Sequence, residues 1–469
     1  MRRLRQLAER TPPGRDRYVD LLRALAIAMV VLGHWGVTVI GYQHGRPTGH
    51  SALPDLPWAW PLTWVAQVMP VFFLVGGYAN AASLAARRAR GGTATGWLVD
   101  RSARLVRPTT ALLLVLAVGA TVATLRGADP AQVRTVVWFA TIPLWFLVAY
   151  LVVVASTPPM YALHRRFGLA VPVVLAGLVA LGDLGRLLGP AALADGNYLF
   201  AWLAVHQLGF AWYDARSPEL ARRRRLPLDR RAGATLLLVG LAALVLLTTV
   251  GPYPVAMLHV AGERLDNAAP PSVALLAAAT TQLGLILLLR RPAGHWLRRS
   301  GPWQAVIAIN AVVLTVFLWH LTAAILLVGL LDALGLLPTP PVGSVTWWAW
   351  RIPWLAALAV VLAALVAVFG PIEARTRRPS GPHGQAGPHG VGAGAARRVG
   401  SDPGVGERGA PWTALAVAGY AALVAGLLLN SLAPKAAPEP LGLPAPALVA
   451  YLAGAGLLRL LRSGWGSRG

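Results

Sequence analysis

The sequence contains no cysteine, and its single lysine is Lys435. The absence of cysteine excludes disulfides, thiolate metal sites and an acyl-cysteine intermediate. The lysine lies in a stretch rich in proline and alanine, which excludes a Walker-type phosphate loop and a Schiff-base lysine. Chemistry in a buried site of this chain must therefore use histidine, carboxylate, arginine, tyrosine, serine or threonine.

Charged residues are also few. They make up 13% of the 469 residues, where a soluble domain carries about 25%, and hydrophobic residues make up 56%. The apolar residues fall in blocks of roughly 20, the length needed to cross about 30 Å of hydrocarbon. These features exclude a soluble enzyme, a disordered chain and a nucleic-acid-binding protein. They predict an all-α, polytopic protein whose partner is the lipid bilayer.

Ten apolar blocks predict a membrane domain over residues 20–370, preceded by a basic cytoplasmic segment, 1–19. The blocks are 20–41, 58–80, 108–125, 135–156, 169–188, 198–213, 232–250, 272–289, 304–330 and 349–370. Residues 371–411 are predicted to be a flexible cytoplasmic linker, because so few apolar side chains cannot offset the entropy of ordering. Two further spans over 412–460 bring the total to about twelve, and 461–469 form a cytoplasmic tail.

Arginine-rich connections follow the second, fourth, sixth and eighth blocks. Arginine is retained on the cytoplasmic side of a membrane, so this alternation predicts a multi-pass protein of the cell membrane with both termini in the cytoplasm. The basic start resembles the n-region of a signal peptide, but no small-residue cleavage site follows, so the first span is predicted to be uncleaved. Four arginines depart from the alternation and fall in predicted outer connections: Arg46, Arg126, Arg134 and Arg264.

Three histidines and one aspartate fall at predicted membrane depth, where ionisable groups are costly and are functional candidates by default. At 1.5 Å per residue, His34 and His320 lie roughly 21 and 25 Å from the cytoplasmic edge. His206 lies about 12 Å below the outer edge, and Asp183 is at a comparable height. A neutral histidine in a dry site can accept a proton from a hydroxyl. The alternatives are histidines that only pack between helices, and an ion pair of Asp183 with Arg186.

Cationic side chains gather at the predicted cytoplasmic boundary. Arg23 lies within the first apolar block, with Asp20 three residues before it on the same helical face. Arg101, Arg104 and Arg107 recur every three residues before the third block. Such a stripe can bind phosphates, although arginines that face lipid headgroups are the commoner case. An arginine cluster below a catalytic base suits a long carrier with an anionic head and a reactive tip, such as acyl-coenzyme A (acyl-CoA).

Five segments, in order, resemble the acyltransferase 3 family of integral membrane acyltransferases. They are YVDLLRALAIAMVVLGHWG with an Arg-x10-His signature, MPVFFLVGGYANAASL, DRSARLVRP, PLWFLVAYL and VFLWHLTAA. The resemblance covers about residues 15–370, and the pair of spans over 412–460 has no counterpart in it. The family often has a serine near the end of the second span, where this chain has Gly76 and Gly77.

The resemblance implies transfer of an acyl group, commonly acetyl, from cytoplasmic acyl-CoA to a hydroxyl or amine of a sugar or other small acceptor at the outer face. His34 would be the base or the acyl carrier, and Asp20 and Arg23 would complete the catalytic group. The acyl-CoA site would include Arg101, Arg104, Arg107 and Trp145. His320, His206 and Asp183 are candidates for contacts to the acceptor or to the catalytic group. No metal is expected.

Other functions remain open from the residues alone. A transporter or flippase would also place polar groups at the midplane between broken helices, and Pro70 with Gly76 and Gly77 favours such a break. A polyprenyl-phosphate sugar transferase generally needs acidic metal-binding loops, and the predicted outer loops hold few carboxylates. A purely structural scaffold is the third alternative. The long outer connection 251–271 either lines the acceptor entrance, through His259, Glu263 and Asn267, or is an inert loop.

Overall fold

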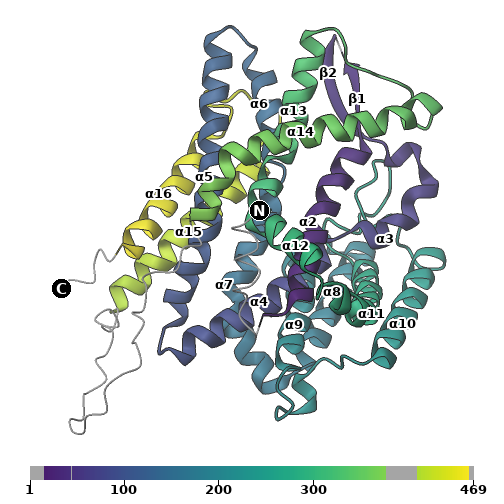
Figure 1. The fold of residues 1–469 in the computed structure, drawn as a ribbon, viewed down its shortest axis with the longest axis vertical. Helices are drawn as coiled ribbons and strands as arrows, with labels where there is room; N and C mark the ends of the chain where they lie inside the picture. The colour runs from purple at the N-terminus through teal and green to yellow at the C-terminus, as the bar shows by residue number, and fades with distance from the viewer. Residues whose placement is uncertain (1–14, 44, 376–408, 464–469) are drawn as a thin grey trace.

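The computed structural model describes residues 15–43, 45–375 and 409–463, and the described chain is mostly helical, as predicted (Figure 1). The α-helices are α2 (Arg17–Val37), α3 (Thr63–Ala66), α4 (Met69–Ala89), α5 (Ala94–Leu125), α6 (Pro130–Thr141), α7 (Leu144–Phe167), α8 (Ala170–Leu188), α9 (Asn197–Asp214), α10 (Arg230–Thr249), α11 (Val273–Trp296), α12 (Ser300–Ala311), α13 (Val313–Ala333), α14 (Val345–Arg375), α15 (Ala410–Leu432) and α16 (Ala445–Arg462). Strands β1 (Thr38–Gln43) and β2 (Arg46–Ser51) form a hairpin, and the 3-10 turns are η1 (Leu53–Asp55), η2 (Pro57–Leu62), η3 (Ala191–Gly196) and η4 (Arg222–Arg224).

Eleven helical segments of the described residues are long and apolar enough to cross a membrane. This confirms the prediction of an all-α, polytopic membrane protein. The predicted sixth span, 198–213, forms α9 but is not among the eleven. Its polar side chains Asn197, His206 and Gln207 are all fully buried. A helix enclosed by other helices does not need an apolar surface against lipid, so α9 tolerates these polar residues.

The first span is shorter than the predicted 20–41. The chain leaves α2 at Val37 and enters an antiparallel hairpin in which Thr38 pairs with Ser51 and Gln43 with Arg46. The segment Val37–Ile40 consists of β-branched residues, which favour a pleated strand over a helix. The prediction of helix over 38–41 is therefore wrong, and the hairpin lies directly beyond the end of α2 that carries His34.

The predicted second span, 58–80, lies within one candidate membrane segment, Pro57–Ala89, of which the continuous helix α4 forms the second part. Pro61 lies within η2, and α4 starts only at Met69 with Pro70 in its first turn, where its missing N–H costs no helical hydrogen bond. The helix passes unbroken through Gly76 and Gly77, so the suggestion of a broken helix there is wrong. A Cβ atom on Gly77 would lie 2.0 Å from the carbonyl oxygen of His206. These glycines let α4 and α9 approach closely.

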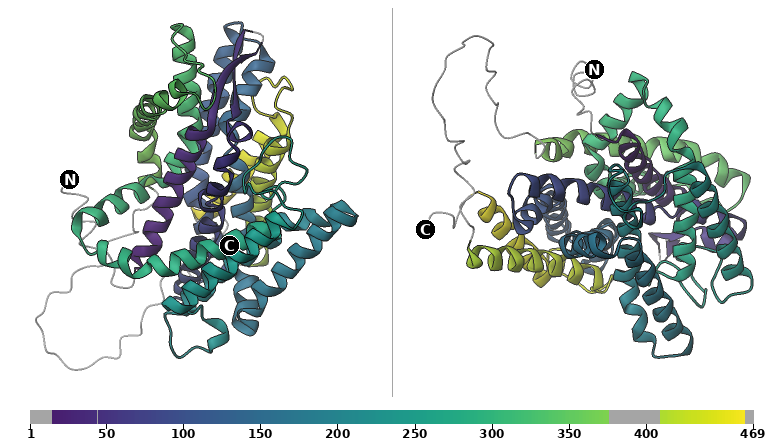
Figure 2. Two further views of the ribbon diagram at one scale, coloured as in Figure 1. Left: turned by 90° about the vertical axis from the view of Figure 1, so that its right-hand side faces the viewer. Right: turned by 90° about the horizontal axis from the view of Figure 1, so that it is seen from below.

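The helices are not all parallel. In Figure 1, α5 is seen lengthwise, whereas α8 and α11 are seen nearly end-on, and Figure 2 shows the same inclination from two further sides. Position along a helix is therefore not by itself a measure of depth in the membrane.

Two large clusters of buried apolar residues form the core, and α2 contributes to both. Ile27, Val31 and Trp35 pack in the cluster that also contains residues of α5, α7 and α13. Tyr18 and Leu22 pack in the cluster built around α4, α9 and α11. The helix that carries the Arg-x10-His signature thus joins the two halves of the core, as does α7 through Leu151 and Val153.

The C-terminal pair α15 and α16 packs on the core beside α5 and α7 (Figure 1, yellow-green and yellow). Arg134 of α6 is fully buried, and its guanidinium donates to the carbonyl oxygens of Ala433, Pro434 and Gly442 in the turn between the two helices. The Tyr420 hydroxyl donates to the carbonyl of Leu151 over 2.7 Å. Buried hydrogen bonds to backbone oxygens fix the position of the pair on the core.

The predicted linker, 371–411, overlaps described structure only at its ends. Helix α14 continues to Arg375, and α15 begins at Ala410. Residues 376–408 lie outside the described residues, as do 1–14 of the basic N-terminal segment and 464–469 of the tail. The division into a core domain, a linker and an appended pair stays a prediction.

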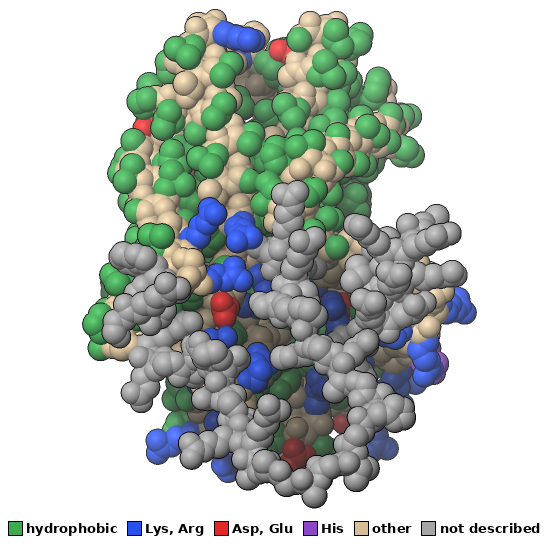
Figure 3. Space-filling model, turned by 60° about the vertical axis from the view of Figure 1, so that its left-hand side comes forward, with side chains coloured by type: hydrophobic (Ala, Val, Ile, Leu, Met, Phe, Trp, Pro, Cys, Tyr) green, Lys and Arg blue, Asp and Glu red, His purple; other side chains and the backbone are tan. Residues whose placement is uncertain are grey.

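Arginine and lysine side chains gather on one part of the surface. On the face shown in Figure 3, they lie mainly in the lower half, whereas the upper half is mostly hydrophobic. Two of the arginines that fall in predicted outer connections have protein partners: Arg46 pairs with Asp129 at 2.9 Å, and Arg134 is buried against backbone carbonyls. The orientation of the chain across the membrane stays a prediction.

Candidate functional site

Two of the three predicted intramembrane histidines are in contact. His34 lies in the last turn of α2, and His320 lies on α13, where it is fully buried. The distance between Nδ1 of His34 and Nε2 of His320 is 2.7 Å, and the rings are stacked at an angle of 10°. The indole N–H of Trp35 also donates to the carbonyl oxygen of His320. Adjacent residues of α2 therefore hold both the ring and the backbone of His320.

A backbone carbonyl determines which ring nitrogens of this histidine pair carry protons. Nδ1 of His320 lies 2.6 Å from the carbonyl oxygen of Phe317. A carbonyl can only accept, so Nδ1 of His320 carries the proton and, in the neutral ring, Nε2 accepts. Nδ1 of His34 must then be the donor to His320. This relay leaves Nε2 of His34 with an unprotonated lone pair, which is the nitrogen a base or nucleophile needs.

The predicted cationic group assembles at the other end of α2. Nη1 of Arg23 lies 3.2 Å from a carboxylate oxygen of Asp20, and Arg15 donates to the same carboxylate. Arg23 lies within electrostatic range of Arg101 on α5 and of Tyr150 on α7. Arg101 donates to the hydroxyl of Tyr150 over 3.2 Å. Helices α2 and α5 thus bring positive charge to one place, with the Tyr150 hydroxyl of α7 beside it, and an anionic group would find donors there.

Aromatic rings lie between the cationic group and the histidine pair. Phe317 is 6.1 Å from the His320 ring by centroid and 5.4 Å from Phe146. Phe146 is in turn 5.9 Å from Tyr150, the residue that holds Arg101. The two predicted groups are therefore ends of one continuous set of contacts that crosses α2, α5, α7 and α13. A row of aromatic contacts of this kind suits the uncharged arm of a ligand whose head is charged.

A family profile described as an acyltransferase domain matches residues 16–370 of the chain. The chain belongs to the acyltransferase 3 family. Membership implies a transferase that moves an acyl group, and the apolar helices place it in a membrane. No curated protein and no solved structure shows significant similarity to the chain.

The match begins at the first turn of α2 and ends near the end of α14. The acyltransferase domain therefore contains both the histidine pair and the cationic group, and α15 and α16 lie outside it. The buried contacts of Arg134 and Tyr420 nevertheless join these two helices to the domain.

The third predicted histidine, His206, lies apart from the pair in the described structure. Its Nε2 is 3.1 Å from the Asn80 amide nitrogen, and its ring packs edge-on against Phe210. A Cβ atom on Gly76 would lie 3.1 Å from the Tyr150 ring and 3.9 Å from the His206 ring. His206 therefore borders the cationic end of the candidate site, next to the Tyr150 ring that holds Arg101.

Arg104, Arg107 and Trp145 are more exposed than the rest of the predicted site. Arg104 and Arg107 lie on the outward side of α5, and Trp145 is 41% exposed at the start of α7. Their roles in binding acyl-CoA stay predictions. Arg101, by contrast, is half-buried and hydrogen-bonded to Tyr150.

Asp183 is the centre of a different polar cluster. Its carboxylate pairs with Arg186 at 3.7 Å and accepts from the Tyr253 hydroxyl and the Val273 N–H, both at 2.8 Å. Burial, and then the Asp183 carboxylate, raise the pKa of Tyr253, so its hydroxyl remains a donor. These contacts tie the connection 251–271 to α8 and α11. The ion pair with Arg186, considered as the alternative from the sequence, is present.

Of the three residues predicted to line the acceptor entrance, one is buried and two are exposed. Asn267 is buried, and its amide donates to the carbonyls of Pro254 and Ala256. His259 is exposed and lies 2.8 Å from Asp266. Glu263 is exposed. Asn267 holds the connection together, and the other two stay candidates for contacts to an acceptor.

Three residues that support the site were not identified from the sequence. Tyr150 holds Arg101, and Asn80 holds His206. Glu373, 4% exposed, accepts from the backbone N–H groups of Leu314 and Thr315 and so caps α13, the helix of His320. A carboxylate at the free N–H groups of a helix start is favourable. The sequence places Glu373 in the predicted linker, 371–411, because a single carboxylate among prolines and arginines does not indicate that it caps a distant helix.

Proposed function

We propose that this protein transfers an acyl group, with acetyl as the candidate that the family resemblance implies, from cytoplasmic acyl-CoA to a hydroxyl or amine of a sugar or related acceptor at the outer face. The observation that best supports this is the relay from the Phe317 carbonyl through His320 to His34. The relay directs the lone pair of His34 Nε2 away from its partner histidine. Family membership supports the acyl transfer itself.

The chemistry of this proposal balances at His34. For direct transfer, Nε2 takes the proton from the acceptor hydroxyl as its oxygen attacks the thioester carbonyl. The carbon–sulfur bond then breaks, and the same nitrogen returns the proton to the thiolate of CoA. In the relayed route, Nε2 attacks the thioester carbonyl, the carbon–sulfur bond breaks and CoA leaves as the thiolate. The acceptor oxygen then attacks the acyl carbon, the carbon–nitrogen bond breaks, and the freed Nε2 takes the hydroxyl proton and passes it to the thiolate. Both routes need the proton on Nδ1.

The cationic group is the proposed binding site for the head group of acyl-CoA, the acyl donor. Arg23 and Arg101 are half-buried, and Asp20 balances only part of their positive charge because it also pairs with Arg15. Phosphates of CoA would complete that balance through charge-assisted hydrogen bonds. The pantetheine arm would then follow the aromatic contacts of Phe146 and Phe317 towards His34.

The test uses purified protein, acetyl-CoA and a thiol reagent. The chain has no cysteine, so every thiol detected is released CoA. We expect the wild-type protein to release CoA, by slow hydrolysis or by transfer, and His34→Ala to lower that rate at least about 1,000-fold, as for loss of an essential base or nucleophile. Full activity of a folded His34→Ala variant would refute the proposed role of His34.

His295→Ala is the matched control. His295 lies on α11, is exposed, and contacts only the carbonyl of Arg291 among the described residues. Its loss should leave CoA release unchanged. Elution as a single peak in detergent checks that both variants are folded.

A further inference from the structure

The C-terminal pair, α15 and α16, lies outside the matched acyltransferase domain, yet it packs against two helices of the proposed site for the acyl-CoA head group. Helix α15 packs on α7, which carries Tyr150, and both helices of the pair pack on α5, which carries Arg101. The pair therefore covers parts of α5 and α7 that would otherwise face the lipid.

On the α7 side, a buried tyrosine of the pair holds the backbone beside Tyr150. The hydroxyl of Tyr420, a residue that is 5% exposed, donates to the carbonyl oxygen of Leu151 over 2.7 Å, and Leu151 follows Tyr150 in the chain. The Tyr420 side chain also lies within electrostatic range of Tyr150 and Arg101. A hydrogen bond to a backbone oxygen restricts the rotation and the height of a helix, because the carbonyl cannot turn independently of its peptide plane.

On the α5 side, a charged residue of the pair contacts the neighbour of Arg101. Nε of Arg462, in the last turn of α16, lies 3.5 Å from a carboxylate oxygen of Asp100, which precedes Arg101 in the chain. Asp100 also pairs with Arg87 of α4 at 3.1 Å. Exposed ion pairs of this kind contribute little stability. The contact therefore shows where α16 meets α5, and Tyr420 is the stronger of the two attachments.

The placement of α5 relative to α7 decides whether Arg101 is ordered. Its guanidinium and the Tyr150 hydroxyl come from different helices, and they are 3.2 Å apart. A displaced α7 would release the Arg101 side chain, which has several rotatable bonds. An anionic head group would then have to order that side chain on binding, which costs about three- to tenfold in affinity. Holding α7 in place therefore favours binding of the acyl donor rather than the chemical step.

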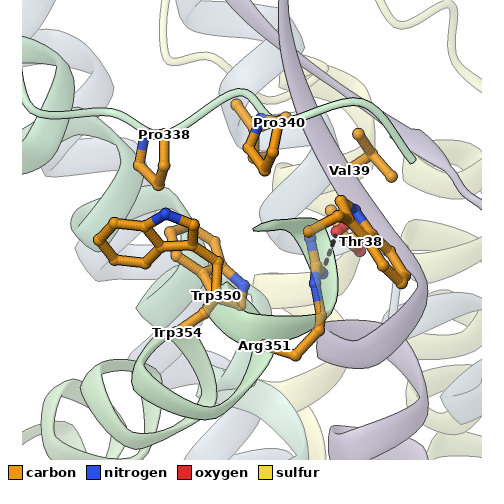
Figure 4. A pocket seen from close by; sticks show the side chains of 9 residues that line it. Thr38, Val39, Pro338, Pro340, Trp350, Arg351 and Trp354 are labelled. Atoms are coloured by element: carbon orange, nitrogen blue, oxygen red, sulfur yellow. Dashed lines mark hydrogen bonds between the residues drawn. The ribbon is translucent and has the colours of Figure 1, made fainter. Parts of the chain in front are cut away.

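The opposite end of α2 has a comparable support. In the pocket between the hairpin and α14, Nη1 of Arg351 donates to the carbonyl oxygen of Thr38 over 3.0 Å (Figure 4). The Thr38 hydroxyl donates in turn to the carbonyl oxygen of His34. There too, a helix from the later part of the chain bonds to the backbone beside a residue of the proposed site. The Tyr420 contact is a second such support, and it comes from outside the family domain.

An appended helix pair could also serve only as a membrane anchor for the C-terminal end of the chain. Such an anchor needs close packing between its two helices, and glycines supply that here: a Cβ atom on Gly454 would lie 2.5 Å from the carbonyl oxygen of Gly419. An anchor does not need a buried tyrosine hydroxyl, which is costly to bury unless it is hydrogen-bonded. The hydrogen bond of Tyr420 to α7 therefore favours a role within the acyltransferase.

We infer that α15 and α16 are a functional part of the acyltransferase and that Tyr420 is a positioning residue, which acts through Leu151 and Tyr150 to hold Arg101 ready for the head group of acyl-CoA. This inference rests on the proposed function, and it adds a role for a helix pair outside the family domain.

The test compares two single-hydroxyl variants of the full chain in the CoA-release assay. Tyr420→Phe should raise KM for acetyl-CoA roughly three- to tenfold and leave kcat within about twofold. Tyr451→Phe is the matched control. Tyr451 is 1% exposed, and its hydroxyl donates to the carbonyl oxygen of Val106, more than one turn beyond Arg101. This variant should lower the melting temperature in detergent by a similar amount but leave KM within about twofold.

A double variant separates positioning from general stability. In a Tyr150→Phe background the contact with Arg101 is already lost, so Tyr420→Phe should raise KM by less than about twofold further. The inference is overturned if Tyr420→Phe leaves KM at the wild-type value, if Tyr451→Phe raises KM as much, or if the effects of Tyr420→Phe and Tyr150→Phe on KM multiply.

Failure of the proposed function would look different. A wild-type protein that neither binds CoA nor releases it from acetyl-CoA would refute the proposed head-group site and this inference with it. A wild-type protein with a measurable KM that Tyr420→Phe does not change would refute this inference alone.

Discussion

At the scale of single residues, the position of the ring proton on His34 is determined by a carbonyl oxygen that His34 does not contact. The Phe317 oxygen fixes the proton on His320, and His320 in turn fixes the proton on His34. A neutral imidazole otherwise divides its proton between two nitrogens. His320 is therefore a positioning residue in this proposal, because it acts on the reaction only through His34.

Replacing His320 tests that role. His320→Phe keeps an aromatic ring but removes the acceptor for Nδ1 of His34, so the ring loses both its tautomer and its orientation. We expect kcat for CoA release to fall roughly 10- to 100-fold, the range for a buried hydrogen bond worth about 1–3 kcal/mol. KM for acetyl-CoA should stay within about twofold. A rise in KM with unchanged kcat would place His320 in donor binding instead.

Arg104 is predicted to act on binding rather than on chemistry, because a phosphate contact is made equally in the ground and transition states. Arg104→Ala should raise KM for acetyl-CoA roughly tenfold and leave kcat within about twofold. The control is Arg166→Ala. Arg166 lies at the end of α7 that is predicted to face the cytoplasm, and its guanidinium lies over the Phe167 ring. An effect confined to kcat would contradict the assignment of Arg104 to the CoA head group.

At the scale of elements, the apolar blocks predicted the helices because a bilayer demands about 20 apolar residues per crossing. The same criterion explains the errors. It counted Thr38–Gly41 as helix because β-branched residues are apolar enough for a span, although they favour a strand. It also did not show that the second membrane segment starts as the 3-10 turn η2, which contains Pro61, and continues as the α-helix α4 only from Met69.

The sequence could name candidate residues for the site, but it could not show which of them are in contact. Charge and predicted depth made His34, Arg23 and His320 candidates, and the family resemblance supplied the roles proposed for His34 and Arg23. One sequence does not tell which helices are neighbours, so it could not pair His34 with His320 or leave His206 beside Asn80. Tyr150 gave no signal, because a tyrosine within an apolar run is common and its hydroxyl matters only through Arg101.

The contact between α4 and α9 is tested by adding one methyl group. In Gly77→Ala the new Cβ would lie 2.0 Å from the His206 carbonyl oxygen, so the helices must move apart. We expect a loss of at least about 1–3 kcal/mol in stability, as for overpacking, and a lower melting temperature in detergent. Gly119→Ala on α5, where nothing lies within 4 Å, should be neutral or slightly stabilising. Equal melting temperatures for the two variants would show that α9 is not packed as described.

At the scale of the whole molecule, the proposed reaction has a direction. The cationic group and the hairpin lie at opposite ends of α2, near Arg23 and beyond Val37. The proposal requires the Arg23 end to face the cytoplasm, where acyl-CoA is made, and the hairpin end to face outward. The charge alternation predicts the same orientation, so both can be tested by one experiment.

The natural chain is already free of cysteine, so single cysteines report orientation without background. Ala128, between α5 and α6, and Ala221, before η4, are both exposed. We expect Ala128→Cys to react with a membrane-impermeant maleimide in intact cells, and Ala221→Cys to react at least about tenfold more after lysis than before. Arginine retention in the cytoplasm is the physical reason, because Ala221 precedes four consecutive arginines. The opposite labelling pattern would turn the hairpin end of α2 towards the cytoplasm, and transfer to an outer acceptor would then be impossible by this route.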